Sequence, residues 1–496
     1  MEILGYIVIG IYTIALAYIT IFCLMQLNLL YYYKKYHRNP DQLSDWESMD
    51  EVPHVTVQLP IFNEMYVVPR LVDCIVQLDC PKDKLEIQIL DDSTDETVEI
   101  AKAKVEEYKA QGYDIVHIHR TDRNGFKAGA LKEATRVAKG AFIAIFDADF
   151  LPRKHFLKRT IPQFKNDKVG VVQTRWEHIN EDYSLLTRLQ ALQLNVHFRI
   201  EQIGRRGANC MLQFNGTAGV WRKQTIEDAG GWEADTLTED LDLSYRAQLH
   251  GYEIIYLEEL SSPAELPAEM NGLKSQQFRW MKGGAETARK MLPTVWKSKL
   301  TFFQKLHATV HLMSSGVFVF IFIAGVFSVP LVALISINGL GYGYMTYFLI
   351  GLLSVVAVYF TANVDSEIKY PDPEDNQTYI NKFVKFIFLF PVFLSLSMGL
   401  SLHNTVAVIQ GYWGKKSPFV RTPKFNIQNL TDTFKKGSYF QGRLSWTTIF
   451  EGLLALYFLV GLIMGLYLET TLFIYFHAML MIGYGSIFFF SIKHIR

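Results

Sequence analysis

Apolar residues in this chain are concentrated in long segments that flank one polar block. Residues 3–33 contain no charged side chain, and this run is longer than the roughly 20 residues that a helix needs to cross a bilayer. Later apolar runs predict further spans at residues 313–337, 345–362, 452–468 and 471–491. The pattern predicts a multi-pass integral membrane protein.

Basic residues predict the orientation of these spans. Lys34, Lys35 and Arg38 follow the first apolar run, whereas a cleavable signal peptide carries its basic residues ahead of the run. We therefore expect the first segment to stay attached, with its basic flank in the cytoplasm. The basic residues at 493–496 predict a cytoplasmic position for that segment by the same rule.

One apolar segment, residues 383–402, does not fit a simple crossing. A crossing there would place the basic loop at residues 415–424 outside, against the positive-inside bias. We therefore expect this segment to lie at the cytoplasmic interface or to be only partly inserted.

The polar block, residues 41–299, alternates between two periodicities. Short β-branched runs at 55–59, 87–90, 115–119 and 141–146 are separated by helical stretches at 96–111 and 129–138. Such alternation predicts an α/β domain with a mostly parallel, doubly wound sheet. The chain thus divides into an N-terminal helix with its flank (1–40), this domain (41–299) and a helical membrane part (300–496).

Composition excludes some classes of function. Lys plus Arg and Asp plus Glu both number 49, so no overall charge would attract nucleic acid. The four cysteines, Cys23, Cys74, Cys80 and Cys210, have neither zinc-ligand spacing nor the pattern of a disulfide framework. No nucleic-acid partner, structural zinc or disulfide is expected.

Acidic residues follow three of the predicted strands. The segments PIFNE, DDSTDET and DADF begin at residues 60, 91 and 147, and ligands of such sheets bind beyond the carboxyl ends of the strands. Asp147 and Asp149 could share Mg²⁺ or Mn²⁺ with a diphosphate. A lone DxD is more often a solvated turn, but Asp91 and Asp92 at the preceding strand end weaken that reading, because clustered carboxylates need a compensating cation.

Two further positions suit transfer chemistry. Lys127 opens a helix in NGFKAGAL, where free backbone N–H groups also favour phosphate. Thr238-Glu239-Asp240 precedes a helical run and is by itself compatible with an N-cap. Asp240, at a helix start facing a metal-diphosphate site, could also accept a proton from an incoming hydroxyl.

The segment SQQFRWMKGG, residues 275–284, brings an amide, a guanidinium and an indole together shortly before a membrane span. Arg279 could bind pyrophosphate oxygens in a bidentate way, and Trp280 offers a flat face to a sugar ring. The alternative is an amphipathic interface helix with its tryptophan at headgroup depth.

In this order, the motifs QLPIFNE, LDDSTDET, NGFKAGAL, DAD, QTRWEH, FNGTAGVWR, TED and QQFRW resemble the processive family 2 glycosyltransferases, the group of the cellulose and hyaluronan synthases. They are especially similar to the cellulose-synthase-like mannan and glucomannan synthases. The resemblance extends over residues 55–284. A weaker one, FVRTPK at 419–424, is similar to the gating loop of cellulose synthases, with Arg421 where that pattern has valine.

The resemblance implies a GT-A type domain inserted between transmembrane helices, and a role for each matching residue. Glu64 with Asp91 or Asp92 would contact the base and ribose, Lys127 the phosphates, and Asp147 with Asp149 the metal and sugar diphosphate. Asp240 would be the general base. The remaining positions are, for the diphosphate and acceptor sugar, Gln276, Arg279 and Trp280; for the acceptor, Asn215, Gly216 and Glu239; and for a cytoplasmic gating-like loop at 411–446, Phe419, Thr422 and Lys424.

The resemblance implies an inverting hexosyltransferase of the plasma or inner membrane, with a cytoplasmic catalytic domain that extends a β-linked mannan, glucomannan or glucan from GDP-mannose or UDP-glucose. Accessory subunits are compatible with it. The alternatives are a non-processive transferase that adds one sugar to a lipid, and a transporter or scaffold with an idle nucleotide-binding domain. Product length and donor turnover distinguish these possibilities.

Overall fold

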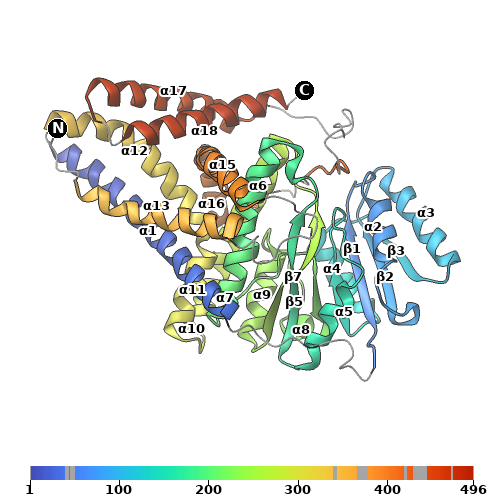
Figure 1. Ribbon diagram of the computed structural model, residues 1–496. Coiled ribbons are helices and arrows are strands. Elements are labelled where there is room, and N and C mark those ends of the chain that lie inside the picture. Colours follow the sequence, from blue (N-terminus) through green and yellow to red (C-terminus); the bar gives the residue numbers. More distant parts are fainter. Residues whose placement is uncertain are drawn as a thin grey trace.

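A computed structural model describes residues 2–38, 44, 51–338, 343–365, 378–417, 420, 422–427, 444–470 and 473–494. It has two parts, an α/β domain and a group of long helices to one side of it (Figure 1). The strands are β1 Val55–Ile61, β2 Leu85–Asp91, β3 Asp114–His119, β4 Phe142–Ile145, β5 Val169–His178, β6 Gly219–Arg222 and β7 Glu253–Ala264.

These strands form one seven-stranded sheet in the order β3-β2-β1-β4-β6-β5-β7. Strands β3, β2, β1 and β4 are parallel, β6 is antiparallel to both of its neighbours, and β7 is parallel to β5. The mostly parallel sheet expected from the sequence is confirmed. The four strands and two helices predicted in the first half of the domain are all present, within a few residues of their expected bounds.

Helices cover both faces of the sheet, and every residue of β1 and β2 is buried, including the polar pairs Thr56–Glu86 and Gln58–Gln88, which hydrogen-bond across the two strands. One face packs against α2, α3 and α5, and the other against α4, α8 and α9. The helices of the domain are α2 Val68–Ile75, α3 Thr97–Ala110, α4 Phe126–Val137, α5 Phe156–Thr160, α6 Leu185–Asn195, α7 Gln202–Gly207, α8 Lys223–Asp228 and α9 Glu239–Leu249, with short turns η2 Lys82–Lys84, η3 Ile161–Lys165, η4 Glu181–Tyr183 and η5 Val196–Glu201.

The second part is helical. It comprises α1 Glu2–Arg38, α10 Met270–Lys297, α11 Phe302–Leu312, η6 Ser314–Gly316, α12 Val317–Asn338, η7 Gly343–Phe348, α13 Leu349–Phe360, η8 Thr361–Asp365, α15 Tyr379–Gly399, α16 Ser401–Trp413, α17 Trp446–Tyr467 and α18 Ile474–Lys493. Helices α17 and α18 run side by side along the top of Figure 1.

Six helical segments among the described residues are long and apolar enough to cross a membrane, so the chain is an integral membrane protein. Five of them match the predicted spans. The sixth, Tyr379–Gly399, overlaps the segment expected at the interface; its length and composition also suit a span, and its placement stays a prediction. Both ends of the α15–α16 pair lie near the α/β domain, since Lys385 lies 3.6 Å from Asp182, and Tyr412 packs against a core cluster that contains Leu241 and Tyr245 of α9.

Helix α1 continues past its apolar run and packs against α7 of the α/β domain. A Cβ atom at Gly204 would lie 2.5 Å from the carbonyl oxygen of Leu29, so only glycine permits this approach. Leu30 and Tyr33 are buried in the same core as the sheet. The first span is therefore joined directly to the domain.

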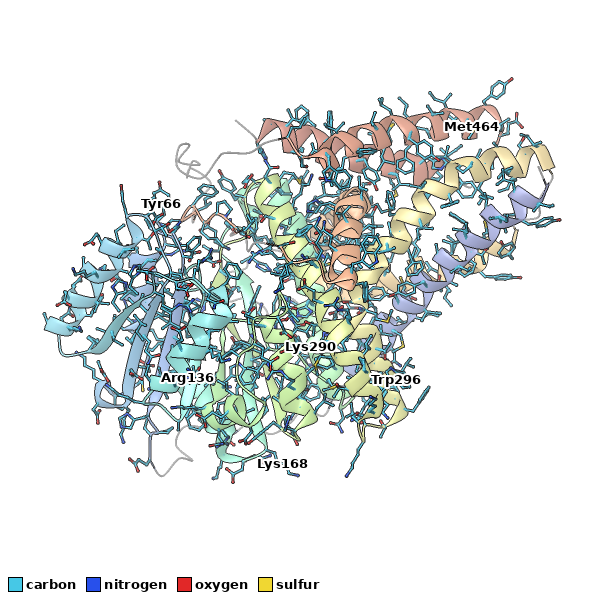
Figure 2. The ribbon with its side chains drawn as sticks, turned by 180° about the vertical axis from the view of Figure 1, so that it is seen from behind. Tyr66, Arg136, Lys168, Lys290, Trp296 and Met464 are labelled. Atoms are coloured by element: carbon cyan, nitrogen blue, oxygen red, sulfur yellow. The ribbon has the colours of Figure 1, made fainter. Side chains whose placement is uncertain are left out.

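Helix α10 connects the two parts, because one end pairs with the α/β domain and the other with a helix of the helical part. Near its C-terminal end, Lys290 lies against the α/β domain (Figure 2) and pairs with Glu233, Asp235 and Asp242 at 2.5, 2.9 and 3.0 Å. Near its N-terminal end, Lys274 pairs with the fully buried Glu451 of α17 at 2.8 Å.

Candidate active site

A cavity opens beyond the carboxyl ends of β1, β2 and β4, and residues of α9 and α10 also line it. It gathers nearly all of the residues singled out in the sequence. Those that line it are Glu64, Asp92, Lys127, Asp147, Asp149, Asn215, Gly216, Glu239, Asp240, Gln276, Arg279, Trp280, Thr422 and Lys424.

Two of the expected residues are not among them. Asp91 is fully buried, where its carboxylate accepts hydrogen bonds from the backbone of Ser93 and from the Nε2 atom of His117, both at 2.8 Å. Of these two neighbouring acids, Asp92 lines the cavity. Its two carboxylate oxygens accept hydrogen bonds from the Nε and Nη2 atoms of Arg120, both at 2.7 Å. Phe419 lies outside the described residues.

Each carboxylate of the DxD motif is paired with a lysine. Lys127 of α4 lies 2.5 Å from Asp147 and also donates to the carbonyl oxygen of Gly216 at 2.9 Å. Lys424 lies 2.7 Å from Asp149. Burial opposes the charged form of Lys127, but the Asp147, Glu239 and Asp240 carboxylates outweigh it and raise the pKa of this lysine. The acidic strand end is thus electrically compensated from two sides.

Asp240 lies in the first turn of α9, beside Glu239. Burial raises the pKa of Asp240 to about 7, and the neighbouring Glu239 carboxylate adds to the shift. Its Oδ1 atom accepts the backbone N–H of Leu241 at 2.8 Å. A carboxyl group with its pKa close to neutrality is well suited to take up a proton at physiological pH.

Gly216 packs directly against this carboxylate. Its φ angle is +79°, and a Cβ atom there would lie 2.9 Å from the Oδ2 atom of Asp240. Both the left-handed backbone and the close approach require glycine. The FNGTAG motif therefore allows the main chain to pass beside Asp240.

One face of α10 carries Gln276, Arg279 and Trp280 into the cavity. Their spacing of three and four residues places them on the same side of a helix. The Nη2 atom of Arg279 donates to the hydroxyl of Thr422 at 2.8 Å. The trio expected from QQFRW is brought together in this way.

Residues 422–427 lie across the site and are held by Glu265. Lys424 donates to the Glu265 carbonyl at 2.6 Å, and the backbone N–H of Phe425 donates to its carboxylate at 2.8 Å. This carboxylate also lies 3.3 Å from the backbone nitrogen of Ile427. The segment is consequently tied to Asp149, Arg279 and Glu265 together.

Sequence reasoning missed several lining residues. Trp176 and His178 come from the QTRWEH motif, whose order was recognised without a role for either side chain. Arg123 stacks on Phe62 with 3.3 Å between the guanidinium carbon and the ring centre, and both line the cavity. Nothing in the local sequence of Glu265 distinguishes it from a surface acid.

The comparison with known families gives a class to this domain. Residues 53–283 match the family model described as "Glycosyltransferase like family 2". That stretch contains the sheet and α10 as far as Gly283, so the α/β domain is similar to glycosyltransferase family 2 domains.

Two curated proteins of Arabidopsis thaliana are similar to the chain. Glucomannan 4-beta-mannosyltransferase 7 is 39% identical over 281 residues, which cover 54% of this chain and 50% of that protein. Probable glucomannan 4-beta-mannosyltransferase 10 is 38% identical over 290 residues, which cover 56% and 52% respectively. The chain therefore spans about half the length of these relatives.

Among solved structures, the fold is similar to the mannosyltransferase PcManGT from Pyrobaculum calidifontis in complex with GDP-Man and Mn²⁺. The TM-score is 0.52 at 18% identity, covering 80% of this chain and all of that one. This likeness concerns the fold alone, and it confirms the expected GT-A type domain.

Proposed function

We propose that the chain is a membrane-embedded inverting glycosyltransferase that transfers a hexose from a nucleotide sugar to a growing β-linked polysaccharide. The observation that carries the proposal is one cavity beside the membrane helices that holds Asp147, Asp149, Asp240, Arg279 and Trp280. The names of the curated relatives favour mannose as the transferred sugar, and hence GDP-mannose over UDP-glucose.

The donor binds along the strand ends. Glu64 and Asp92 face its base and ribose, while Lys127 and Arg279 supply cations to its two phosphates. Arginine suits this position because its planar fork matches phosphate oxygens in a bidentate way. Oriented positive groups stabilise the charge that grows on the leaving diphosphate.

Asp147 and Asp149 fit a divalent cation, Mg²⁺ or Mn²⁺. They lie one residue apart, face the same cavity and present only carboxylate oxygens, the donors that hard divalent ions prefer. Each of the two carboxylates forms an ion pair with a lysine, which is consistent with a site that favours positive charge. When bound, the ion supplies charge that stabilises the diphosphate.

Asp240 acts as the general base. An acceptor hydroxyl that approaches the anomeric carbon from the Asp240 side loses its proton to this carboxylate as the bond to the diphosphate breaks. One displacement assisted by one base inverts the anomeric centre, so an α-linked donor yields a β-linked product. Trp280 and Glu239 frame the acceptor sugar in this geometry.

We place the catalytic domain on the cytoplasmic side of a plasma or inner membrane. Lys34, Lys35 and Arg38 stand at the domain end of α1, in agreement with the positive-inside bias. The α15–α16 pair begins and ends near the domain, which supports an interfacial position for it. In a Val420→Cys variant, the new cysteine should react only with thiol reagents added on the cytoplasmic side. Labelling from outside would contradict this topology.

Residues 422–427 form the gate in this proposal. Thr422 and Lys424 contact Arg279 and Asp149, two groups that the donor also needs. Donor entry therefore requires these contacts to rearrange. The membrane helices beside the cavity offer the polymer a route outward, with Trp280 at its start.

The deciding experiment incubates the purified chain with radiolabelled GDP-mannose or UDP-glucose and digests the product with linkage-specific hydrolases. We expect a polymer from GDP-mannose that an endo-β-1,4-mannanase degrades, and at least about 100-fold slower formation of it by Asp240→Asn. A single sugar on a lipid would instead establish the non-processive transferase. No donor turnover at all would leave an idle binding domain.

A further inference from the structure

Two histidines project from β3, which lies at an edge of the seven-stranded sheet. His117 and His119 are separated by one residue, and strand residues at this spacing point to the same face of a sheet. Ile115, two positions earlier, packs in the core cluster on the α2 and α3 side, so the two histidines share that face. Their ring centres lie 5.9 Å apart. The edge strand thus presents a pair of neighbouring imidazoles.

The carboxylate of Asp91 faces both of these rings. Asp91 ends β2 and is the register partner of His119. Its Oδ2 atom lies 2.8 Å from the Nε2 atom of His117 and 3.7 Å from the Nδ1 atom of His119. All three side chains offer an atom within 4.8 Å of the other two. The candidate active site does not use this carboxylate, because its neighbour Asp92 lines the cavity instead.

These separations suit a divalent transition-metal ion. A tetrahedral ion with bonds of roughly 2.0–2.2 Å to imidazole nitrogen and carboxylate oxygen holds its ligand atoms about 3.3 Å apart. The two measured separations, 2.8 and 3.7 Å, lie on either side of that value. Small adjustments of the side chains therefore bring the three atoms to one ion, without a change in the strand pairing.

The carboxylate is also held in the orientation that a metal ligand needs. Its Oδ1 atom accepts the backbone N–H of Ser93 at 2.8 Å, and the hydroxyl of Ser93 accepts the backbone N–H of Asn63 at 2.8 Å. These contacts leave Oδ2 directed at the two imidazoles. Hydrogen bonds of this kind commonly orient the residues that bind a metal.

Solvent reaches the cluster from the side of β3. The side chain of His119 is 33% exposed, that of His117 is 13% exposed, and Asp91 is buried behind them. An ion therefore meets His119 first. Binding to the other two groups replaces the proton between the Nε2 atom of His117 and the Oδ2 atom of Asp91, because a neutral imidazole that carries its proton on Nδ1 offers a lone pair at Nε2.

The donor set indicates the class of ion. Two imidazoles and one carboxylate suit Zn²⁺, Co²⁺ and similar ions, whereas Mg²⁺ and Ca²⁺ prefer oxygen ligands. The cluster differs in this respect from Asp147 and Asp149, which offer oxygen alone. The expectation of no structural zinc rested on the spacing of the cysteines, and this cluster uses none of them.

We propose that Asp91, His117 and His119 form a structural site for a divalent ion of the zinc class, with water completing the coordination. The ion joins the edge strand β3 to the end of β2, next to the residue Asp92 of the cavity. The inference is independent of the proposed function, because none of the three ligands lines the cavity.

The test uses the full-length chain, purified without a histidine tag and kept in excess Mg²⁺ to occupy the oxygen ligands of the cavity. Co²⁺ is the probe, because its absorption in the visible region reports its ligands and geometry. We expect saturable bands from one bound Co²⁺ per chain, which Zn²⁺ abolishes by displacement and further Mg²⁺ does not. Zn²⁺ should also raise the temperature of thermal unfolding, since it binds the folded state.

His119→Gln removes the most exposed ligand and should leave the fold intact. It should weaken Co²⁺ binding at least about 100-fold, since the loss of a group that merely orients a ligand already costs about 10- to 100-fold. His117→Gln should weaken binding as much, while its amide can still donate to Asp91. His155→Gln, at an exposed histidine of the same domain, is the matched control and should bind Co²⁺ as the unmodified chain does.

Three outcomes overturn the inference. They are the absence of saturable Co²⁺ binding by the unmodified chain, unchanged affinity in a folded His119→Gln protein, and stabilisation by Zn²⁺ that is as large in His119→Gln as in His155→Gln. Failure of the proposed function is distinguishable, because metal binding and thermal unfolding are measured without any sugar donor.

Discussion

The two walls of the cavity that we propose for the donor and for the acceptor, called the donor wall and the acceptor wall below, are built in opposite ways. The donor wall is charged and lies at strand ends, where Asp147 and Asp149 each pair with a lysine. The acceptor wall is mostly neutral and comes from β5, α10 and the loop before β6, with Trp176, Trp280 and Asn215 as its main side chains. Asp240 and Glu239 bring negative charge to this side.

The difference matches what each wall would hold in the proposed function, a nucleotide sugar on one side and the end of a polymer on the other. A nucleotide diphosphate is an anion that is released after every transfer, so strong oriented charge is useful in binding it and in stabilising its departure. A polymer end is neutral and must move on after each addition. Aromatic faces and single hydrogen bonds bind it without fixing one position. Substitutions on the two walls should consequently differ in size and in the quantity they change.

The largest effect is expected at the metal-binding end of the donor wall. Asp149→Asn should lower activity by about 10⁴-fold or more and remove most of its dependence on Mg²⁺ or Mn²⁺, since an amide coordinates these ions poorly. Initial rates across a metal titration measure this. Asp167→Asn, at a side chain that is fully exposed, is the matched control. An Asp149→Asn enzyme with full activity at ordinary metal concentrations would exclude the clamp.

Asp240→Asn should come next, with a rate loss of about 10²- to 10⁴-fold, the range for removal of a positioned base. The substitution keeps the shape of the side chain, so donor affinity measured by calorimetry should change little. If donor affinity falls in parallel with the rate, Asp240 contributes to donor binding or to folding of the protein, and Glu239 becomes the first candidate for the base.

Between the two walls, the pH dependence should report on Asp240. Because burial and Glu239 raise its pKa to about 7, the base is protonated at lower pH, and kcat/KM should fall about tenfold per unit below that value. Glu239→Gln removes the second cause of the shift, so its acid limb should move to lower pH. A limb that stays in place would mean that Asp240 is not the titrating group.

The smallest effect is expected on the acceptor wall. Trp176→Leu removes an aromatic face that Phe198 supports, and it should lower incorporation of sugar into polymer about tenfold or less while shortening the polymer. Chain length by size-exclusion chromatography is the measurement. Trp296→Leu, at an exposed tryptophan of the same protein, is the control. A loss of incorporation as large as that caused by Asp149→Asn would contradict the expected difference between the two walls.

The donor wall was largely predictable from sequence because its chemistry is local. Strand ends of a parallel sheet meet at one edge, so the acids of DDSTDET and DADF had to converge once the strands were recognised. The choice between Asp91 and Asp92 was not predictable, since it depends on which side chain turns inward to His117.

On the acceptor wall, only residues that lie within a recognised motif could be predicted from the sequence. Trp280 and Asn215 lie in quoted motifs, whereas no role was predicted for His197, which lies 2.8 Å from the Oδ1 atom of Asn215, or for Glu201, which lies 2.9 Å from His197. Their proximity to Asn215 depends on the π-helical turn η5 and on tertiary packing, neither of which leaves a periodic signal. Glu265 is a similar case, because its partners at 424–427 are some 160 residues away along the chain.

Helix α1 has a consequence for how the protein moves. Its 37 residues correspond to a rod of about 55 Å, well beyond the roughly 30 Å of a hydrocarbon core, and the excess is packed against α7 through Gly204. The catalytic domain and its first span should therefore share one rotational diffusion time in the bilayer. In the proposed function, each new sugar would then be added at a constant height above the lipid, and the polymer would always be met from the same direction.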